Sequence, residues 1–76
     1  MRQLCVLVAE VLGVEHGAVG AHTGPLTLSK WDSLNHMRIV AAVEETYGVQ
    51  LTTDEILNIL NVTDLAALLR EKGAGL

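Results

Sequence analysis

The stretch from Trp31 to Met37 (WDSLNHM) contains a serine hydroxyl and an imidazole three positions apart, at Ser33 and His36. If this stretch forms a helix, the two side chains share a face and can meet. An imidazole that accepts the hydroxyl proton activates serine as a nucleophile, so the pair is compatible with a hydrolase. A hydrolase also needs an oxyanion hole, an orienting group and a substrate pocket. None of these is recognisable elsewhere in the 76 residues, so the sequence predicts no catalytic residue.

Ser33 can alternatively serve as a point of covalent attachment. Asp32 is a suitable N-cap, because its carboxylate can accept a hydrogen bond from a backbone N–H group of the first helical turn. A serine next to this cap lies at the positive end of the helix dipole, where a phosphate diester on its oxygen is well tolerated. The tripeptide Asp-Ser-Leu is weak support by itself, since it should occur by chance in roughly a few per cent of chains this long.

The composition argues against several other classes of protein. The net charge of -4 is unlike that of nucleic-acid-binding domains, which carry clustered basic side chains. It suits partners that present basic patches. His16, His22 and His36 lack metal-ligand spacing, and the single Cys5 allows neither an internal disulfide nor a cysteine-based metal site. No apolar run reaches the about 18 residues of a membrane span. We therefore expect a soluble, cytoplasmic monomer without a metal, a nucleic-acid partner or a membrane segment.

The chain is expected to form one domain, residues 1–76, with an aliphatic core. Apolar spacing and capping residues predict four helices: 2–12, 32 or 33 to 47, a short helix that starts at about 53, and 61–72. Gly13 and Gly48 are placed to end the first two helices, and Thr52 can start the third with a capping box. The predicted class is all-α, a four-helix bundle with a long first loop and a short third helix.

Two apolar stripes run along the second predicted helix, and only one of them can face the core. The first consists of Ile39, Val40, Val43 and Tyr47. The second consists of Leu34, Met37 and Ala41, continued by Glu44 and Glu45. An exposed apolar stripe beside acidic residues is a candidate docking surface. The residues predicted to be largely buried are Leu7, Val8, Val11, Ile39, Val43, Leu65 and Leu68, and those predicted to pin the long loop to the core are Val19, Leu26 and Leu28.

Three motifs in a fixed order make the sequence similar to the acyl carrier protein family, over nearly its whole length. Residues 31–37 (WDSLNHM) stand where the family has its Asp-Ser-Leu attachment motif. Residues 43–49 (VEETYGV) resemble its L-E-E-x-F-G-I segment, and residues 61–65 (NVTDL) resemble the T-V-x-D-L start of its last helix. The family fold is a four-helix bundle with a long first loop and a short third helix.

The resemblance implies a specific modification and specific partners. Ser33 would receive 4′-phosphopantetheine from coenzyme A, through a phosphopantetheinyl transferase that uses Mg²⁺. The thiol of this arm would carry an acyl group as a thioester to acyl-loading enzymes, ketosynthases or other acyl-transferring enzymes. The residues that the resemblance assigns to partner binding are Asp32, Leu34, Met37, Arg38, Ala41, Glu44 and Glu45. Those that it assigns to a pocket for the acyl chain are Val43, Leu51, Ile56 and Ile59.

Departures from the family pattern favour a specialised, polyketide-like pathway over housekeeping fatty-acid synthesis. Arg38 stands on the docking face, where fatty-acid carriers usually have an acidic residue. Trp31 before the motif resembles free-standing carriers of specialised pathways. Asp32 before Ser33 favours the acyl branch over many peptidyl carriers, which often have Gly-Gly-His-Ser or Gly-Gly-Asp-Ser. Peptidyl and D-alanyl carriers remain the alternative within the fold, and an unmodified helical adaptor that binds proteins is the alternative outside it.

Overall fold

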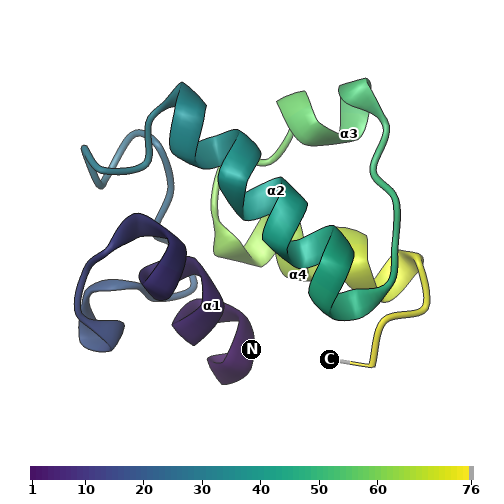
Figure 1. Cartoon of the computed structure of the whole chain (residues 1–76), viewed down its shortest axis with the longest axis horizontal. Coiled ribbons are helices and arrows are strands. Elements are labelled where there is room, and N and C mark those ends of the chain that lie inside the picture. The colour runs from purple at the N-terminus through teal and green to yellow at the C-terminus, as the bar shows by residue number, and fades with distance from the viewer. Residues whose placement is uncertain (76) are drawn as a thin grey trace.

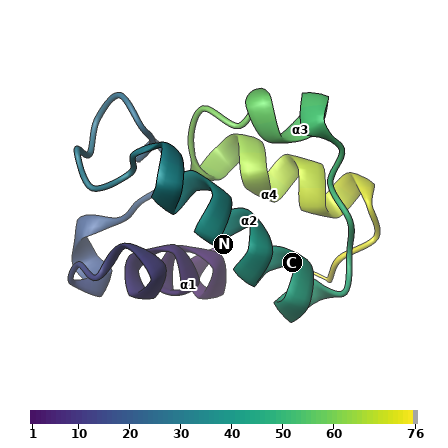
Figure 2. The same ribbon diagram turned by 45° about the horizontal axis from the view of Figure 1, so that its top comes forward.

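The computed structural model describes residues 1–75, and these form an all-helical domain (Figure 1). The helices are α1 (Arg2–Leu12), the 3₁₀ turn η1 (His16–Ala18), α2 (Ser33–Tyr47), α3 (Thr53–Leu57) and α4 (Val62–Glu71). Two views show α2 running diagonally between α1 on one side and α3 with α4 on the other (Figures 1 and 2). The predicted class, with its long first loop and short third helix, is confirmed.

The helix limits follow from local capping chemistry and agree with the predicted ones. Gly13 and Gly48 end α1 and α2 with φ of 70° and 66°, in the left-handed region where a side chain would be strained. Thr52 begins α3 with a capping box, in which its hydroxyl accepts from the Glu55 N–H and the Glu55 carboxylate accepts from the Thr52 N–H. Asn61 caps α4 by accepting from the Asp64 N–H at 2.8 Å.

The core is aliphatic apart from one indole. Its buried members are Leu4, Val8, Ala9, Leu12, Val19, Trp31, Ile39, Val43, Ile59, Val62, Leu65, Ala66 and Leu69. The prediction of burial is confirmed for Val8, Ile39, Val43 and Leu65. Leu7, Val11 and Leu68 are less completely buried and pack against this cluster. The core-facing sides of α1 and α4 are formed by other residues, and these three lie at the flanks of those sides.

The long connection between α1 and α2 is held down by residues that only partly match the predicted ones. Val19 is buried and Leu28 packs against the core, as predicted. Leu26 is instead 92% exposed, so the prediction for this residue is wrong. The anchor that sequence reasoning missed is Trp31, which is 1% exposed. An indole buries more apolar area than any aliphatic side chain, and here it fixes the chain directly before α2.

The same connection also completes the start of α4. The Thr23 carbonyl accepts from the Val62 N–H at 3.0 Å, and the Ala21 carbonyl accepts from the Thr63 N–H at 3.0 Å and from the Thr63 hydroxyl at 2.8 Å. The first N–H groups of a helix have no partner within the helix. Two of those in α4 are therefore satisfied by a segment about 40 positions earlier in the chain.

Gly24 allows this close approach. A Cβ atom built on Gly24 would overlap the Leu60 carbonyl oxygen and lie 3.1 Å from the Asn61 Cα. These are backbone atoms, which cannot rotate away as a side chain would. Only a glycine fits between the connection and the backbone that joins α3 to α4.

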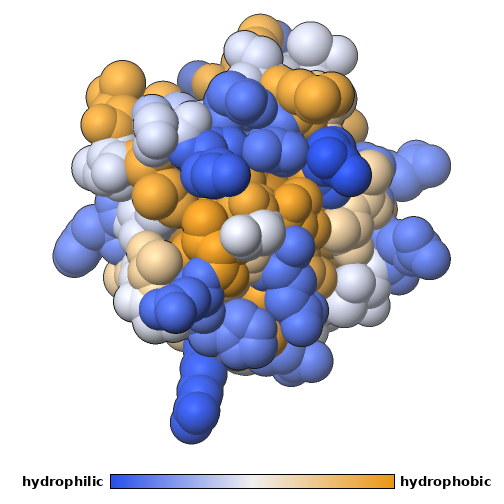
Figure 3. Space-filling model, turned by 60° about the vertical axis from the view of Figure 1, so that its left-hand side comes forward, coloured by the Kyte–Doolittle hydropathy of each residue, from blue (hydrophilic) through white to orange (hydrophobic). Residues whose placement is uncertain are grey.

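The surface on the side of α1 and the long connection has an apolar area at its centre, surrounded by polar side chains (Figure 3). Several residues of α1 are only partly buried, among them Cys5, Val6 and Val11. Among the helices of residues 1–75, none has both the length and the apolar character that crossing a lipid bilayer demands.

Candidate functional site

Ser33 is the first residue of α2, and it is exposed. The predicted N-cap is confirmed: Asp32 Oδ1 accepts from the Asn35 N–H at 2.9 Å. The Asn35 side chain in turn donates from Nδ2 to the Lys30 carbonyl at 2.8 Å. Asn35, which the sequence analysis did not single out, thus ties the segment before Ser33 to the first turn of α2. The serine hydroxyl therefore stands at a fixed, accessible place.

The backbone around Ser33 is suited to a phosphate diester on its oxygen. The His36 N–H donates to the Asp32 carbonyl and the Asn35 N–H to the Asp32 carboxylate. Within residues 1–75 the N–H groups of Ser33 and Leu34 have no protein acceptor. Free N–H groups and the positive end of the helix dipole favour an anion at this position. The residues present thus fit the phosphate of a phosphopantetheine arm.

An imidazole joins the start of α2 to α3. Trp31 Nε1 donates to His36 Nδ1 at 2.8 Å, and His36 Nε2 lies 2.8 Å from the Ile56 carbonyl oxygen. The indole and imidazole centroids are 6.1 Å apart. Sequence reasoning considered His36 as a partner of Ser33 and as a metal ligand, and it missed both bonds. The spacing of Trp31 and His36 was visible in the sequence, whereas the contact with Ile56, 20 positions on, was not.

A groove of about 500 Å³ lies beside Ser33, between the start of α2, α3 and the long connection. Its lining residues are Pro25, Trp31, Asp32, Ser33, His36, Met37, Ile56, Leu57, Ile59 and Leu60. Of the four residues predicted to form an acyl pocket, Ile56 and Ile59 line this groove. Val43 is fully buried in the core, and Leu51 packs against the core. The structure therefore brings together two of the four.

The predicted docking stripe lies largely on the surface. Of the residues assigned to partner binding, the exposed ones are Asp32, Leu34, Met37, Arg38, Ala41 and Glu45. Leu34 is 68% and Met37 is 52% exposed, which is high for large apolar side chains. Leu57 and Leu60, which were not predicted to lie here, are also exposed and line the groove with Met37. The apolar surface near Ser33 thus has contributions from α2, α3 and the α3–α4 connection.

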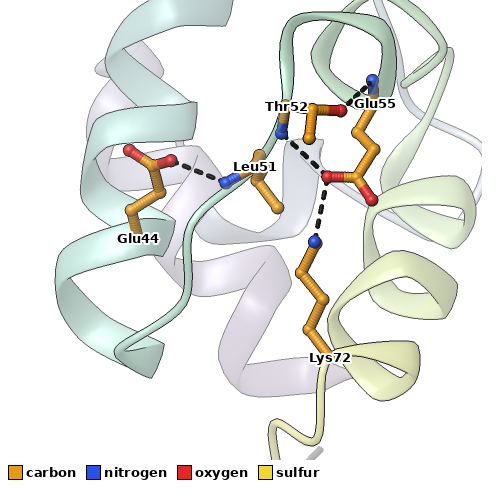
Figure 4. A network of polar contacts seen from close by, with 5 residues as sticks. All are labelled: Glu44, Leu51, Thr52, Glu55 and Lys72. Atoms are coloured by element: carbon orange, nitrogen blue, oxygen red, sulfur yellow. Dashed lines mark hydrogen bonds and ion pairs between the residues drawn. The ribbon is translucent and has the colours of Figure 1, made fainter.

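Glu44, the remaining residue assigned to partner binding, is half-buried and is engaged within the domain. Its carboxylate accepts from the Leu51 N–H at 2.8 Å (Figure 4). In the same view Glu55 accepts from the Thr52 N–H at 2.8 Å and lies 3.0 Å from Lys72 Nζ. These contacts connect the end of α2, the start of α3 and the end of α4. Glu44 therefore has a structural contact that Glu45, on the exposed face, lacks.

The Glu55 contacts predict a pH-dependent contribution to stability. The Thr52 N–H hydrogen bond, together with Lys72, lowers the pKa of Glu55 from its ordinary value of 4.5. A carboxyl group whose pKa is lower in the folded protein than in the unfolded chain stabilises the fold at pH values above its unfolded-state pKa. This contribution is lost as the pH falls through the folded-state pKa. The melting temperature of Glu55→Gln should thus lie below that of the wild type at neutral pH. The gap should close in acid, as followed by circular dichroism. Glu45→Gln is the control, and a gap for Glu55→Gln that persists at about pH 2 would contradict the assignment.

The helical fold, the accessible serine at a helix start and the adjoining groove define a carrier-type domain. The family model described as "Phosphopantetheine attachment site" matches residues 2–69. The chain belongs to this family, and its covalent cofactor is phosphopantetheine. It is also 41% identical, over 73 residues, to the nonribosomal peptide synthetase ecdA of Aspergillus rugulosus. This match covers 96% of the chain and 1% of the synthetase, so the chain spans about one hundredth of that relative's length.

Proposed function

We propose that Ser33 is the residue to which the phosphopantetheine arm is attached. In this reaction the Ser33 Oγ attacks the phosphorus that bears the pantetheine group of coenzyme A, and the pyrophosphate bond breaks. The hydroxyl proton passes to a base of the transferase, and adenosine 3′,5′-bisphosphate leaves. The observation that carries the proposal is the exposed hydroxyl beside two free N–H groups at the start of α2. The only other serine, Ser29, precedes α2 in the connection.

The cargo proposed for the arm is an aminoacyl or peptidyl group, held as a thioester. The support is the likeness to a nonribosomal peptide synthetase over 96% of the chain. This reverses the order that Asp32 favoured in the sequence, where the acyl branch was placed ahead of the peptidyl carriers. The acyl reading remains the second candidate because the groove beside Ser33 is lined mainly by apolar side chains. In either case the domain presents a bound intermediate to separate enzymes.

Mass spectrometry tests both the attachment site and the proposed cargo. The purified chain is incubated with coenzyme A, Mg²⁺ and a broad-specificity phosphopantetheinyl transferase, and fragmentation of the intact protein should place a single added arm on Ser33. Failure to gain mass would favour the unmodified adaptor. The protein isolated from its own cells should then carry a nitrogen-containing aminoacyl or peptidyl thioester. A thioester cargo without an amino group would select the acyl candidate instead.

Arg38 is expected to limit the choice of partner. It is exposed on α2 close to the docking stripe, where the guanidinium would repel a basic patch of an enzyme that normally meets an acid. Repulsion of this kind changes mainly the encounter rate and the preferred partner. Arg38→Glu should therefore speed acyl loading by a generic fatty-acid enzyme, and the gain should shrink at high salt because of screening. Initial rates of wild type and variant at two salt concentrations measure this, and equal rates at low salt would contradict it.

A further inference from the structure

The imidazole of His36 is held by two partners of fixed hydrogen-bonding character. The indole Nε1 of Trp31 can only donate, and the carbonyl oxygen of Ile56 can only accept. Both contacts measure 2.8 Å. His36 Nδ1 must therefore be an unprotonated acceptor, while Nε2 must carry the hydrogen that is donated to Ile56. The geometry is satisfied by one tautomer of the neutral ring and by no other protonation state.

The position of α3 depends on few contacts, and His36 supplies one of them. With five residues, Thr53–Leu57, this helix is too short to be stable by itself. Its first turn is held in place by the Glu55 carboxylate, which accepts a hydrogen bond from the Thr52 N–H and forms an ion pair with Lys72. Near its other end the Ile56 carbonyl is held by His36. Since Trp31 is 1% exposed, the ring anchors α3 to a rigid part of the core.

We propose that His36 is a positioning residue, which as the neutral Nε2–H tautomer fixes α3 relative to Ser33. Trp31, His36 and Ile56 line the same groove as Ser33. The bridge therefore sets the distance between the attachment residue and the α3 side of the surface that a partner enzyme meets. The hydrogen-bonded bridge is a property of the fold alone. Its effect on modification rests on the proposed function of Ser33.

Protonation of the ring would break the bridge on the side of Trp31. A hydrogen on Nδ1 would face the indole N–H, and two donors cannot bond, so a buried N–H group would lose its acceptor. Asp32 is the charged residue that lines the groove with the ring. Of the charged residues on adjoining segments, Lys30 is exposed, Asp54 is exposed, and Glu55 is paired with Lys72. Among residues 1–75, none forms an ion pair with His36.

Nuclear magnetic resonance of the ¹⁵N-labelled apo protein tests the bridge directly. Trp31 is the single tryptophan, so the spectrum contains one indole N–H signal. We expect a coupling across the hydrogen bond between this indole nitrogen and His36 Nδ1, with a proton on Nε2. A neutral ring with its proton on Nδ1 would overturn the proposal.

Two variants distinguish a positioning role of His36 from a role in packing alone. In His36→Gln the amide oxygen can accept from Trp31 and the amide nitrogen can donate to Ile56, so the bridge is kept without an imidazole. In His36→Leu both bonds are lost, and the α3 amides should exchange faster with solvent. His22→Gln, at an exposed site in the long connection, is the matched control, and its indole signal and α3 amide exchange should match those of the wild type. An exchange rate of the α3 amides in His36→Leu that equals the wild-type rate would overturn the role of His36.

Modification kinetics test the link to Ser33. With a phosphopantetheinyl transferase, the KM for folded His36→Leu should rise about fivefold while kcat stays within about twofold, as expected when one hydrogen bond that positions a docking surface is lost. His36→Gln should restore the wild-type KM. An unchanged KM in folded His36→Leu would overturn the positioning role, with Ser33 still modified. Absence of any modification in the wild type would refute the attachment site and, with it, this effect on modification, while the bridge itself is judged by the resonance experiment.

Discussion

Ser33→Ala is expected to abolish phosphopantetheinylation while the domain remains folded. The reaction needs an oxygen nucleophile at this position, and alanine has none. The side chain is exposed, so its removal leaves no cavity. A surface substitution of this kind changes stability by about 0.5 kcal/mol or less. The intact mass after incubation with coenzyme A and transferase should equal that of the apo variant, and its circular dichroism should match that of the wild type.

Ser29→Ala is the matched control for this experiment. It removes the only other serine, which is also exposed, and should be modified at the wild-type rate. A mass increase in Ser33→Ala, or its loss in Ser29→Ala, would move the attachment site away from the start of α2. Either result would leave the fold and the family membership untouched.

Gly24→Ala is expected to have the largest effect on stability. The new Cβ would overlap the Leu60 carbonyl oxygen, so the connection must move away from the backbone between α3 and α4. Such overpacking typically costs 1–3 kcal/mol, and the weakened hydrogen bonds from Val62 and Thr63 add to it, for a total of about 3 kcal/mol. Small domains have total stabilities near the low end of about 5–15 kcal/mol. The urea midpoint should therefore fall steeply.

Gly20→Ala provides the comparison within the same connection. A Cβ on Gly20 would meet nothing within 4 Å, and its backbone is not in the left-handed region. This variant should unfold at the wild-type urea concentration, or slightly above it, because alanine restricts the unfolded chain. Equal midpoints for Gly20→Ala and Gly24→Ala would mean that the connection can shift without loss, and that its contact with the α3–α4 backbone contributes little.

The features that could be predicted from the sequence are those decided by neighbouring residues. Gly13 and Gly48 end helices because of their own backbone freedom, and Asp32 caps α2 through a bond to a residue three positions on. The site of Ser33 could be proposed for the same reason, since its setting is created by the cap and the helix start. The geometry of such caps and helix ends is determined by residues close together in the sequence.

The features that were missed depend on contacts between distant parts of the chain. Nothing near Gly24 indicates that the Leu60 carbonyl will lie against it, and nothing near His36 indicates the Ile56 carbonyl. Leu26 has the apolar character of a core residue, yet it is exposed, whereas Trp31 and Val19 of the same connection are buried. Of the residues assigned to an acyl pocket, Ile56 and Ile59 line the groove beside Ser33, whereas Val43 and Leu51 pack in or against the core.

The pairing of the long connection with α4 has a consequence for how the chain can fold during synthesis. The carbonyls of Ala21 and Thr23 find their partners only when Val62 and Thr63 are present. When the first two helices have left the ribosome, the connection between them is present, but the backbone N–H groups of residues 62–63 that donate to it have not yet emerged. Without that early segment the N–H groups of Val62 and Thr63 would lack their protein acceptors. The hydrogen bonds that join residues 21–23 to the start of α4 therefore form in a late step, after residues 62–63 have left the ribosome.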